Sequence, residues 1–268
     1  PTADGSISAR RGGLNVKLLH DIWLVFGRYL SLLLHNPAWV VVDVVQPLLY
    51  LVLFAPLLKS IANMPGFPPG GAYNVFVPGL LIQLGLFGSA GVGFSLISEV
   101  REGVLERFRV TPVSRLALLL GRALRDIVAM LIQSAILILL ALPFGLNVNG
   151  LGLLIMFGLV ALIGLLFASI SYTVALAVRS EDAYAPIVFT AALPLLLLSG
   201  VLLPLSLAPG WLRALAAANP MSYAVNAGRA IFNNRLGEVS VVQGVVIMAV
   251  LAVAASLFAA RSFSRAVA

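Results

Sequence analysis

Residues 151–178, LGLLIMFGLVALIGLLFASISYTVALAV, form a continuous run in which no side chain carries a charge. A helix needs about 20 mostly apolar residues to cross the hydrocarbon core of a bilayer. The run exceeds that length, and an uncharged stretch of this kind is typical of a membrane-spanning helix. We therefore expect the fold to be set by the bilayer, with this segment as one of its spans.

The composition of the whole chain supports a membrane protein. Of its 268 residues, 61% are hydrophobic and only 10% are charged, whereas soluble domains carry roughly 25% charged residues. The sequence predicts an all-α membrane protein with a polar tail over 1–17 and a membrane domain over 37–268. Six spans are expected, at about 38–58, 75–98, 116–146, 151–178, 185–203 and 240–260.

Residues 18–36 are apolar but interrupted by polar side chains. Lys17, Asp21, Arg28, Ser31 and His35 fall three, four or seven positions apart, which aligns them as one stripe on a helix. This pattern favours an amphipathic helix in the membrane interface. A seventh, tilted span is the alternative that the pattern leaves open.

The basic residues predict the orientation. With the N-terminus in the cytoplasm, 13 of the 17 Lys and Arg residues lie inside, and four, Lys59, Arg213, Arg229 and Arg235, lie outside. Both termini are then cytoplasmic. Residues 204–236 lie on the outer side yet stay largely apolar, which suggests a re-entrant pair of short helices joined at 218–220. Asn219 and Pro220 suit a helix start, as cap and first-turn residue.

Several kinds of chemistry are excluded by residue type. The chain has no cysteine and only two histidines, His20 and His35, both before the first span. A thiolate metal site, a His-rich metal site within the spans and a cysteine nucleophile are therefore not expected, and an enzyme is unexpected. Neither Lys17 nor Lys59 has the preceding glycine that a phosphate-binding P-loop requires. If ATP drives this protein, another subunit must bind it.

The segment 99–115, EVREGVLERFRVTPVSR, has more charge of both signs than a topology-setting loop needs. Val100, Val104, Leu105 and Phe108 fall on one face of a helix over 99–110, and Thr111-Pro112 ends it. The combination predicts a docking surface for a partner. A helix resting on the inner leaflet is the alternative, which the glutamates oppose.

This segment resembles the coupling-helix region of the type-2 family of ABC exporter permeases. The residues that carry the resemblance are Glu99, Gly103, Leu105, Glu106, Phe108, Val110, Thr111, Pro112, Val113, Ser114 and Arg115. Residues 198–204 (LSGVLLP) and 219–223 (NPMSY) with Arg229 resemble later parts of the same family. The chain is most similar to the daunorubicin-resistance-type drug and lipid permeases.

The resemblance implies a homodimer of permeases in the bacterial inner membrane, bound to two cytoplasmic ATPases that hold ATP and Mg²⁺. This chain would bind no cofactor. A second ATPase contact is implied at 178–184, although an ordinary charged turn is nearly as good an interpretation. The implied ATPase-contacting residues are Glu99, Arg101, Glu102, Leu105, Glu106, Arg107, Phe108, Arg109, Arg179, Glu181 and Asp182.

The translocation path is implied to lie between the two permeases, along the first, second and fifth spans. Its candidate residues are Asp43, Gln46, Tyr50, Gln83 and Phe87. A hydrophobic or amphipathic substrate, such as a drug, a lipid or a lipid-linked glycan, is expected.

Two other functions stay open. An ion-coupled secondary transporter would use Asp43, the acidic residue that lies well inside an apolar run. Asp126 is less suited to that role, because Arg122 lies four residues before it and is expected to pair with it. A membrane scaffold that docks a soluble enzyme is the third possibility.

Overall fold

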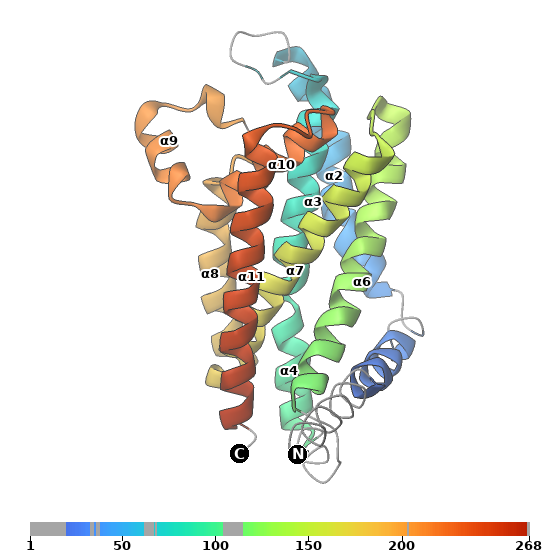
Figure 1. Ribbon diagram of the computed structural model, residues 1–268, viewed down its shortest axis with the longest axis vertical. Coiled ribbons are helices and arrows are strands. Elements are labelled where there is room, and N and C mark those ends of the chain that lie inside the picture. Colours follow the sequence, from blue (N-terminus) through green and yellow to red (C-terminus); the bar gives the residue numbers. More distant parts are fainter. Residues whose placement is uncertain are drawn as a thin grey trace, which may run out of the picture.

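The computed structural model describes residues 20–32, 35, 38–61, 67, 69–103, 115–202 and 204–266. Within these ranges the chain forms helices and short turns, without strands. Long helices run side by side along one axis (Figure 1). They are α2 (Ala38–Ile61), α3 (Gly71–Ala90) continued by α4 (Val92–Arg101), α6 (Arg115–Ala141), α7 (Gly150–Val178), α8 (Glu181–Leu197) and α11 (Val239–Ala266).

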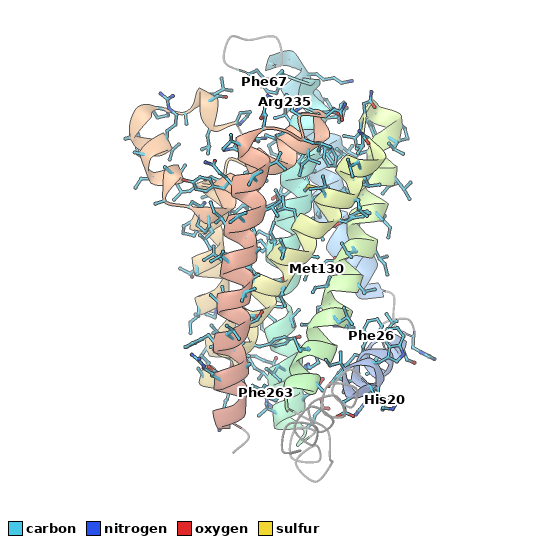
Figure 2. The ribbon with its side chains drawn as sticks, in the orientation of Figure 1. His20, Phe26, Phe67, Met130, Arg235 and Phe263 are labelled. Atoms are coloured by element: carbon cyan, nitrogen blue, oxygen red, sulfur yellow. The ribbon has the colours of Figure 1, made fainter. Side chains whose placement is uncertain are left out.

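The remaining elements are short. They comprise the helical residues 20–32, the helices α9 (Gly210–Ala217) and α10 (Pro220–Phe232), and the 3₁₀ turns η1 (Leu142–Phe144) and η2 (Leu205–Leu207). Residues 20–32 and the end of α11 lie at one end of the bundle, and α9 and α10 lie near the other (Figure 1). The two ends are identified in Figure 2 by His20 and Phe263 at one and by Phe67 and Arg235 at the other.

Four helical stretches are long and apolar enough to cross a membrane: Gly71–Arg101, Leu120–Phe144, Gly150–Val178 and Val239–Phe263. They coincide with the second, third, fourth and sixth predicted spans. The all-helical class is confirmed for the described residues, and the chain is a multi-pass membrane protein. The count of six stays a prediction, because α8 has 17 residues and the apolar part of α2 is the shorter stretch Val44–Phe54.

Helix α7 is the central element, in contact with α3, α4, α6, α10 and α11. One face buries Met156, Val160 and Ile163 at intervals of four and three residues, while Leu154 is 70% exposed. Helix α11 likewise leaves Val246 and Val250 exposed. In water such faces would be unfavourable, whereas lipid solvates them without cost. The bundle is therefore built to be surrounded by hydrocarbon.

The second predicted span is two helices in series. Gly91 separates α3 from α4, and the chain continues in nearly the same direction, because Gly91 keeps right-handed helical angles (φ −68°, ψ −21°). Gly93, two residues further on, lies against the ring of Tyr184 from α8. The Tyr184 hydroxyl donates a hydrogen bond to the carbonyl of Ala90 at 2.6 Å. A glycine is needed where two helices approach this closely.

The predicted helix start at Asn219 and Pro220 is confirmed. The Asn219 side chain accepts a hydrogen bond from the Met221 amide at 3.0 Å, and Pro220 is the first residue of α10. The side-chain amide of Asn219 also donates a hydrogen bond to the Leu195 carbonyl at 2.7 Å, which ties the start of α10 to α8. Residues 204–236 therefore do contain two short helices with their junction at 218–219, while their depth in the membrane stays a prediction.

Replacing Gly93 by valine should destabilise the bundle. Any Cβ at this position overlaps the buried Tyr184 ring, and overpacking of this kind costs about 1–3 kcal/mol. The melting temperature of the detergent-purified variant, followed by size-exclusion fluorescence, should fall. Gly158→Val is the matched control, because a Cβ at Gly158 meets nothing within 4 Å. Equal melting temperatures for the two variants would contradict the close α4–α8 contact.

Candidate functional site

A cavity of about 810 Å³ lies among α2, α3, α4, α6 and α8. Its walls are formed by residues of five kinds, namely apolar, glycine, hydroxyl-bearing, amide and charged. They are Gln46, Pro47, Gln83, Leu84, Phe87, Gly88, Gly91, Val92, Phe94, Ser95, Ser98, Arg125, Asp126, Ala129, Met130, Gln133, Glu181 and Phe189. Its size and its mostly apolar wall with a few polar groups are typical of a small-molecule site.

The polar groups that line the cavity include three amides, those of Gln46, Gln83 and Gln133. Gln83 is only 2% exposed, and its Oε1 has no hydrogen-bond partner within the described residues. A buried polar atom left without a partner is unfavourable unless something else satisfies it. The rings of Phe87 and Phe189, which also line the cavity, stack with centroids 6.3 Å apart. The wall therefore offers hydrogen bonds to a neutral polar group and an aromatic surface to an apolar one.

Three of the five predicted path residues line this cavity: Gln46, Gln83 and Phe87. The Tyr50 ring instead packs against Phe54, with centroids 5.6 Å apart. The side chain of Asp43 is outside the described residues. Sequence reasoning missed Gln133 and Phe189, because helix rotation about the long axis is not fixed by composition. A polar residue in the middle of an apolar run, as Gln133 is, was the available signal.

The end of the bundle nearest helix 20–32 holds a buried ion pair. The Arg122 guanidinium of α6 donates to the Glu99 carboxylate of α4 at 2.6 Å, and both side chains are largely buried. The hydroxyl of Tyr29, from helix 20–32, donates to the same carboxylate at 2.9 Å. Three elements far apart in the sequence are thus joined at Glu99.

Tyr29 stays protonated in this cluster. Burial raises the pKa of its hydroxyl to about 12; the Glu99 carboxylate adds to the rise and the Arg122 guanidinium opposes it. Arg122 also lies over the Tyr29 ring, 5.0 Å from its centroid. A neutral hydroxyl and a stacked guanidinium both stabilise the buried carboxylate. Glu99, predicted to contact a partner, is therefore engaged within its own chain.

The expected pairing of Arg122 with Asp126 is wrong. Asp126 bonds Arg125 at 2.6 Å and accepts a hydrogen bond from the Tyr172 hydroxyl at 2.5 Å. Residues four apart on a helix are neighbours, but Glu99 on the adjacent helix offers Arg122 a closer carboxylate. Asp126 instead holds α6 to α7 and, with Arg125, forms the charged part of the cavity wall.

The two segments predicted to contact the ATPase meet at the end of the bundle nearest helix 20–32. Arg101, the last residue of α4, lies 3.4 Å from the Glu181 carboxylate in the first turn of α8. Both side chains are substantially exposed. Arg179 caps α7 in the left-handed conformation (φ 55°) and Asp182 is exposed. The segments 99–110 and 178–184 thus form one surface where they are described.

The predicted helix over 99–110 is interrupted near its start, because α4 ends at Arg101. Glu99 to Arg101 form the last turn of α4, and Glu102 and Gly103 then turn the chain, with Gly103 at φ +70°. A positive φ is unfavourable for residues other than glycine. Glu102 is exposed and accepts a hydrogen bond from the Ser98 hydroxyl at 2.9 Å. Leu105, Glu106, Arg107, Phe108 and Arg109 lie outside the described residues.

The cavity, the buried ion pairs and the exposed apolar helix faces define a multi-pass membrane protein with a cavity among its helices. No three His, Cys, Asp or Glu side chains gather as a metal-binding group in the ranges that the structure describes.

Residues 20–233 match the family model described as ABC-2 type transporter. The match covers most of the chain, which therefore belongs to this family of ABC transporter membrane subunits.

Two relatives show the extent of the similarity. Over 244 residues the chain is 28% identical to the daunorubicin resistance ABC transporter permease protein DrrB1 of Streptomyces coeruleorubidus, covering 87% of this chain and 80% of the relative. Over 189 residues it is 27% identical to the probable doxorubicin resistance ABC transporter permease protein DrrC of Mycobacterium tuberculosis, covering 69% and 67%. The suspected membership of the type-2 ABC permeases is thus confirmed.

Replacing Arg122 by glutamine should strongly destabilise the protein, because Glu99 would keep a buried, uncompensated charge. Breaking one partner of a buried pair costs about 3–5 kcal/mol. The double variant Arg122→Gln with Glu99→Gln should recover much of the lost thermal stability in detergent. Arg235→Gln is the control, since its ion pair with Glu238 is solvent-accessible and such pairs contribute about 0–1 kcal/mol. Similar melting temperatures for Arg122→Gln and Arg235→Gln would rule out the buried pair.

Proposed function

We propose that this chain is the permease subunit of an ATP-driven exporter, and that the cavity among α2, α3, α4, α6 and α8 is its substrate site. One observation carries the proposal. Arg125, Asp126 and Glu181 are among the residues that line the cavity. Glu181 also forms the ion pair with Arg101 that joins the two segments expected to contact the ATPase. A substrate site and an ATPase-facing surface thus share a charged residue.

The walls favour a hydrophobic or amphipathic substrate. Leu84, Phe87, Met130 and Phe189 offer apolar and aromatic surface, and Gln83 offers an amide. A compound with a large apolar body and a few neutral polar groups satisfies both at once. The names of the drug-resistance relatives agree with such a substrate, and a lipid or a lipid-linked glycan fits the same chemistry.

We further propose the assembly that the family resemblance implies. Two copies of this chain, each with six spans, would pair in a bacterial inner membrane with both termini in the cytoplasm. Helices α2, α3 with α4, and α8 correspond to the first, second and fifth predicted spans, and all of them line the cavity. The cavity would then open toward the second copy. Two separate ATPases would bind ATP and Mg²⁺ and dock on 99–110 and 178–184.

The coupling mechanism follows from how the helices are connected. Movement of the ATPase would act on the end of α4, where Glu99 is bonded to α6 and to helix 20–32 and Arg101 to α8. Because these bonds link the helices around the cavity, a shift at α4 would alter its walls together. ATP binding would in this way bias the permease between inward-open and outward-open states.

Replacing Glu102 and Glu106 together by lysine should uncouple ATP hydrolysis from transport. The change inverts the charge of the surface expected to dock on the ATPase, and Glu102 is exposed, so insertion and folding should be preserved. The double aspartate variant, which keeps the charge, is the matched control. Substrate uptake into inverted vesicles and ATPase turnover are the readouts. Unchanged ATP-driven uptake by the lysine variant would remove the coupling assignment.

Replacing Gly88 by tryptophan should block transport without disturbing the ATPase contact. Gly88 lines the cavity, and a Cβ there has ordinary contacts of 3.7 Å or more, so an indole fits only by filling the space. Uptake should fall at least about tenfold while the amount of co-purified ATPase stays the same. Leu154→Trp, on the lipid-facing side of α7, should transport normally. Equal uptake by the two variants would show that the substrate does not use this cavity.

Vesicle uptake also separates the remaining alternatives. An ion-coupled carrier would transport without ATP, respond to an ion gradient and lose activity on Asp43→Asn. A scaffold would bind its partner through 99–110 without any uptake.

A further inference from the structure

A second cavity, of about 510 Å³, is lined by elements that lie at the opposite end of the bundle from helix 20–32 (Figure 1). It is formed by η2, α9, α10 and the start of α11. The residues around it are Pro204, Leu205, Ser206, Arg213, Ala216, Ala217, Ser222, Tyr223, Asn226, Arg229, Arg235, Glu238 and Ser240. We call it the arginine pocket.

The arginine pocket has a strong positive charge. Arg213, Arg229 and Arg235 face a single carboxylate, Glu238, which leaves a net charge of +2. Three of the four basic residues predicted on the outer side of the membrane thus gather at one place. The positive-inside rule gives outside arginines no function in topology. Their convergence therefore calls for another explanation.

The guanidinium groups of the arginine pocket are only partly used. Arg229 is 5% exposed and donates from Nε to the Val75 carbonyl at 3.0 Å and from Nη2 to the Gly200 carbonyl at 2.6 Å. Within the described residues its Nη1 has no partner. Arg213 has no side-chain partner among the described residues either. Arg235 bonds Glu238 through Nη1 alone. Donors remain available on all three residues.

The adjoining helix indicates the depth of the arginine pocket in the membrane. On α9, Trp211 is 67% exposed and Leu215 is also exposed, while Ala216 is buried against the rest of the chain. Leu207 of η2 is exposed beside them. An exposed tryptophan among exposed leucines on a short amphipathic helix is typical of the boundary between headgroups and acyl chains. The arginine pocket therefore lies at the depth of lipid headgroups.

We infer that the arginine pocket binds a phosphate-bearing anionic group. The planar guanidinium fork matches the oxygens of a phosphate and binds them in pairs. Ser206, Tyr223 and Ser240 add hydroxyl groups around the same space. The group comes either from an anionic lipid headgroup or from a free phosphate on the outer side, and both present the same chemistry to the three arginines.

Native mass spectrometry of the detergent-purified full chain tests this inference. The protein is titrated with phosphatidylglycerol or with zwitterionic phosphatidylcholine. We expect phosphatidylglycerol to be retained in preference. Arg213→Gln should weaken its retention about fivefold, the effect of losing one basic contact near a membrane surface. Arg213→Lys should retain most of the binding, and Glu238→Gln should strengthen it, because the only carboxylate of the pocket is removed.

Lys59→Gln is the matched control. It removes one positive charge from the exposed end of α2, where Lys59 lies over the Tyr73 ring and not in the arginine pocket. It should leave phosphatidylglycerol binding unchanged. Arg213 is exposed, so Arg213→Gln should fold like the parent protein, which an unchanged melting temperature would verify.

Competition with millimolar inorganic phosphate identifies the source of the anionic group. Displacement of the lipid by inorganic phosphate would assign the arginine pocket to a free phosphate group. Retention of the lipid would assign it to a headgroup. Equal retention of the two lipids, or equal effects of Arg213→Gln and Lys59→Gln, would overturn the inference. None of these measurements involves the ATPase or the transported compound.

Discussion

The hydrocarbon core of the bilayer leaves no water to satisfy polar groups, and this constraint determines most of the structure. Each backbone amide must be bonded within its own helix, which accounts for a bundle of helices in the described residues. Polar side chains within the bundle are joined in hydrogen-bonded groups, such as Glu99 with Arg122 and Tyr29, and Asp126 with Arg125 and Tyr172. Each group also holds two or three helices together.

The constraint makes the exceptions informative. The buried Oε1 of Gln83 has no partner among the described residues and lines the central cavity. At the arginine pocket, Arg213 and Arg229 keep donors that bond nothing within the described residues. The two regions differ in chemistry, since one combines amides and aromatic rings with charges of both signs and the other has three guanidinium groups and one carboxylate among its described residues. They also differ in position, because the central cavity reaches the charged end of the bundle at Glu181. The proposed transport function uses the first, and the anion-binding inference uses the second.

Much of the helical architecture was accessible from sequence, because apolar length is a direct consequence of bilayer thickness. The uncharged run at 151–178 matches α7 except that the helix begins one residue earlier, at Gly150. Asn219 caps α10, as its side-chain chemistry predicted. Helix rotation was not accessible, since an apolar helix surrounded by lipid and protein has little periodicity. For this reason the partner of Arg122 was predicted on its own helix, and Phe189 and Gln133 were missed. The turn at Gly103 was also hidden, because the apolar stripe continues past it.

The central claim is that this chain transmits the action of a separate ATPase. The most direct measurement is the mass of the complex obtained when the chain is co-expressed with its cognate ABC ATPase and purified in detergent. The account predicts an assembly of two permeases and two ATPases that is lost when residues 99–110 are scrambled. A stable permease that purifies without any ATPase would contradict the account and would make an ion-coupled carrier, with Asp43 as its first residue to mutate, the better explanation.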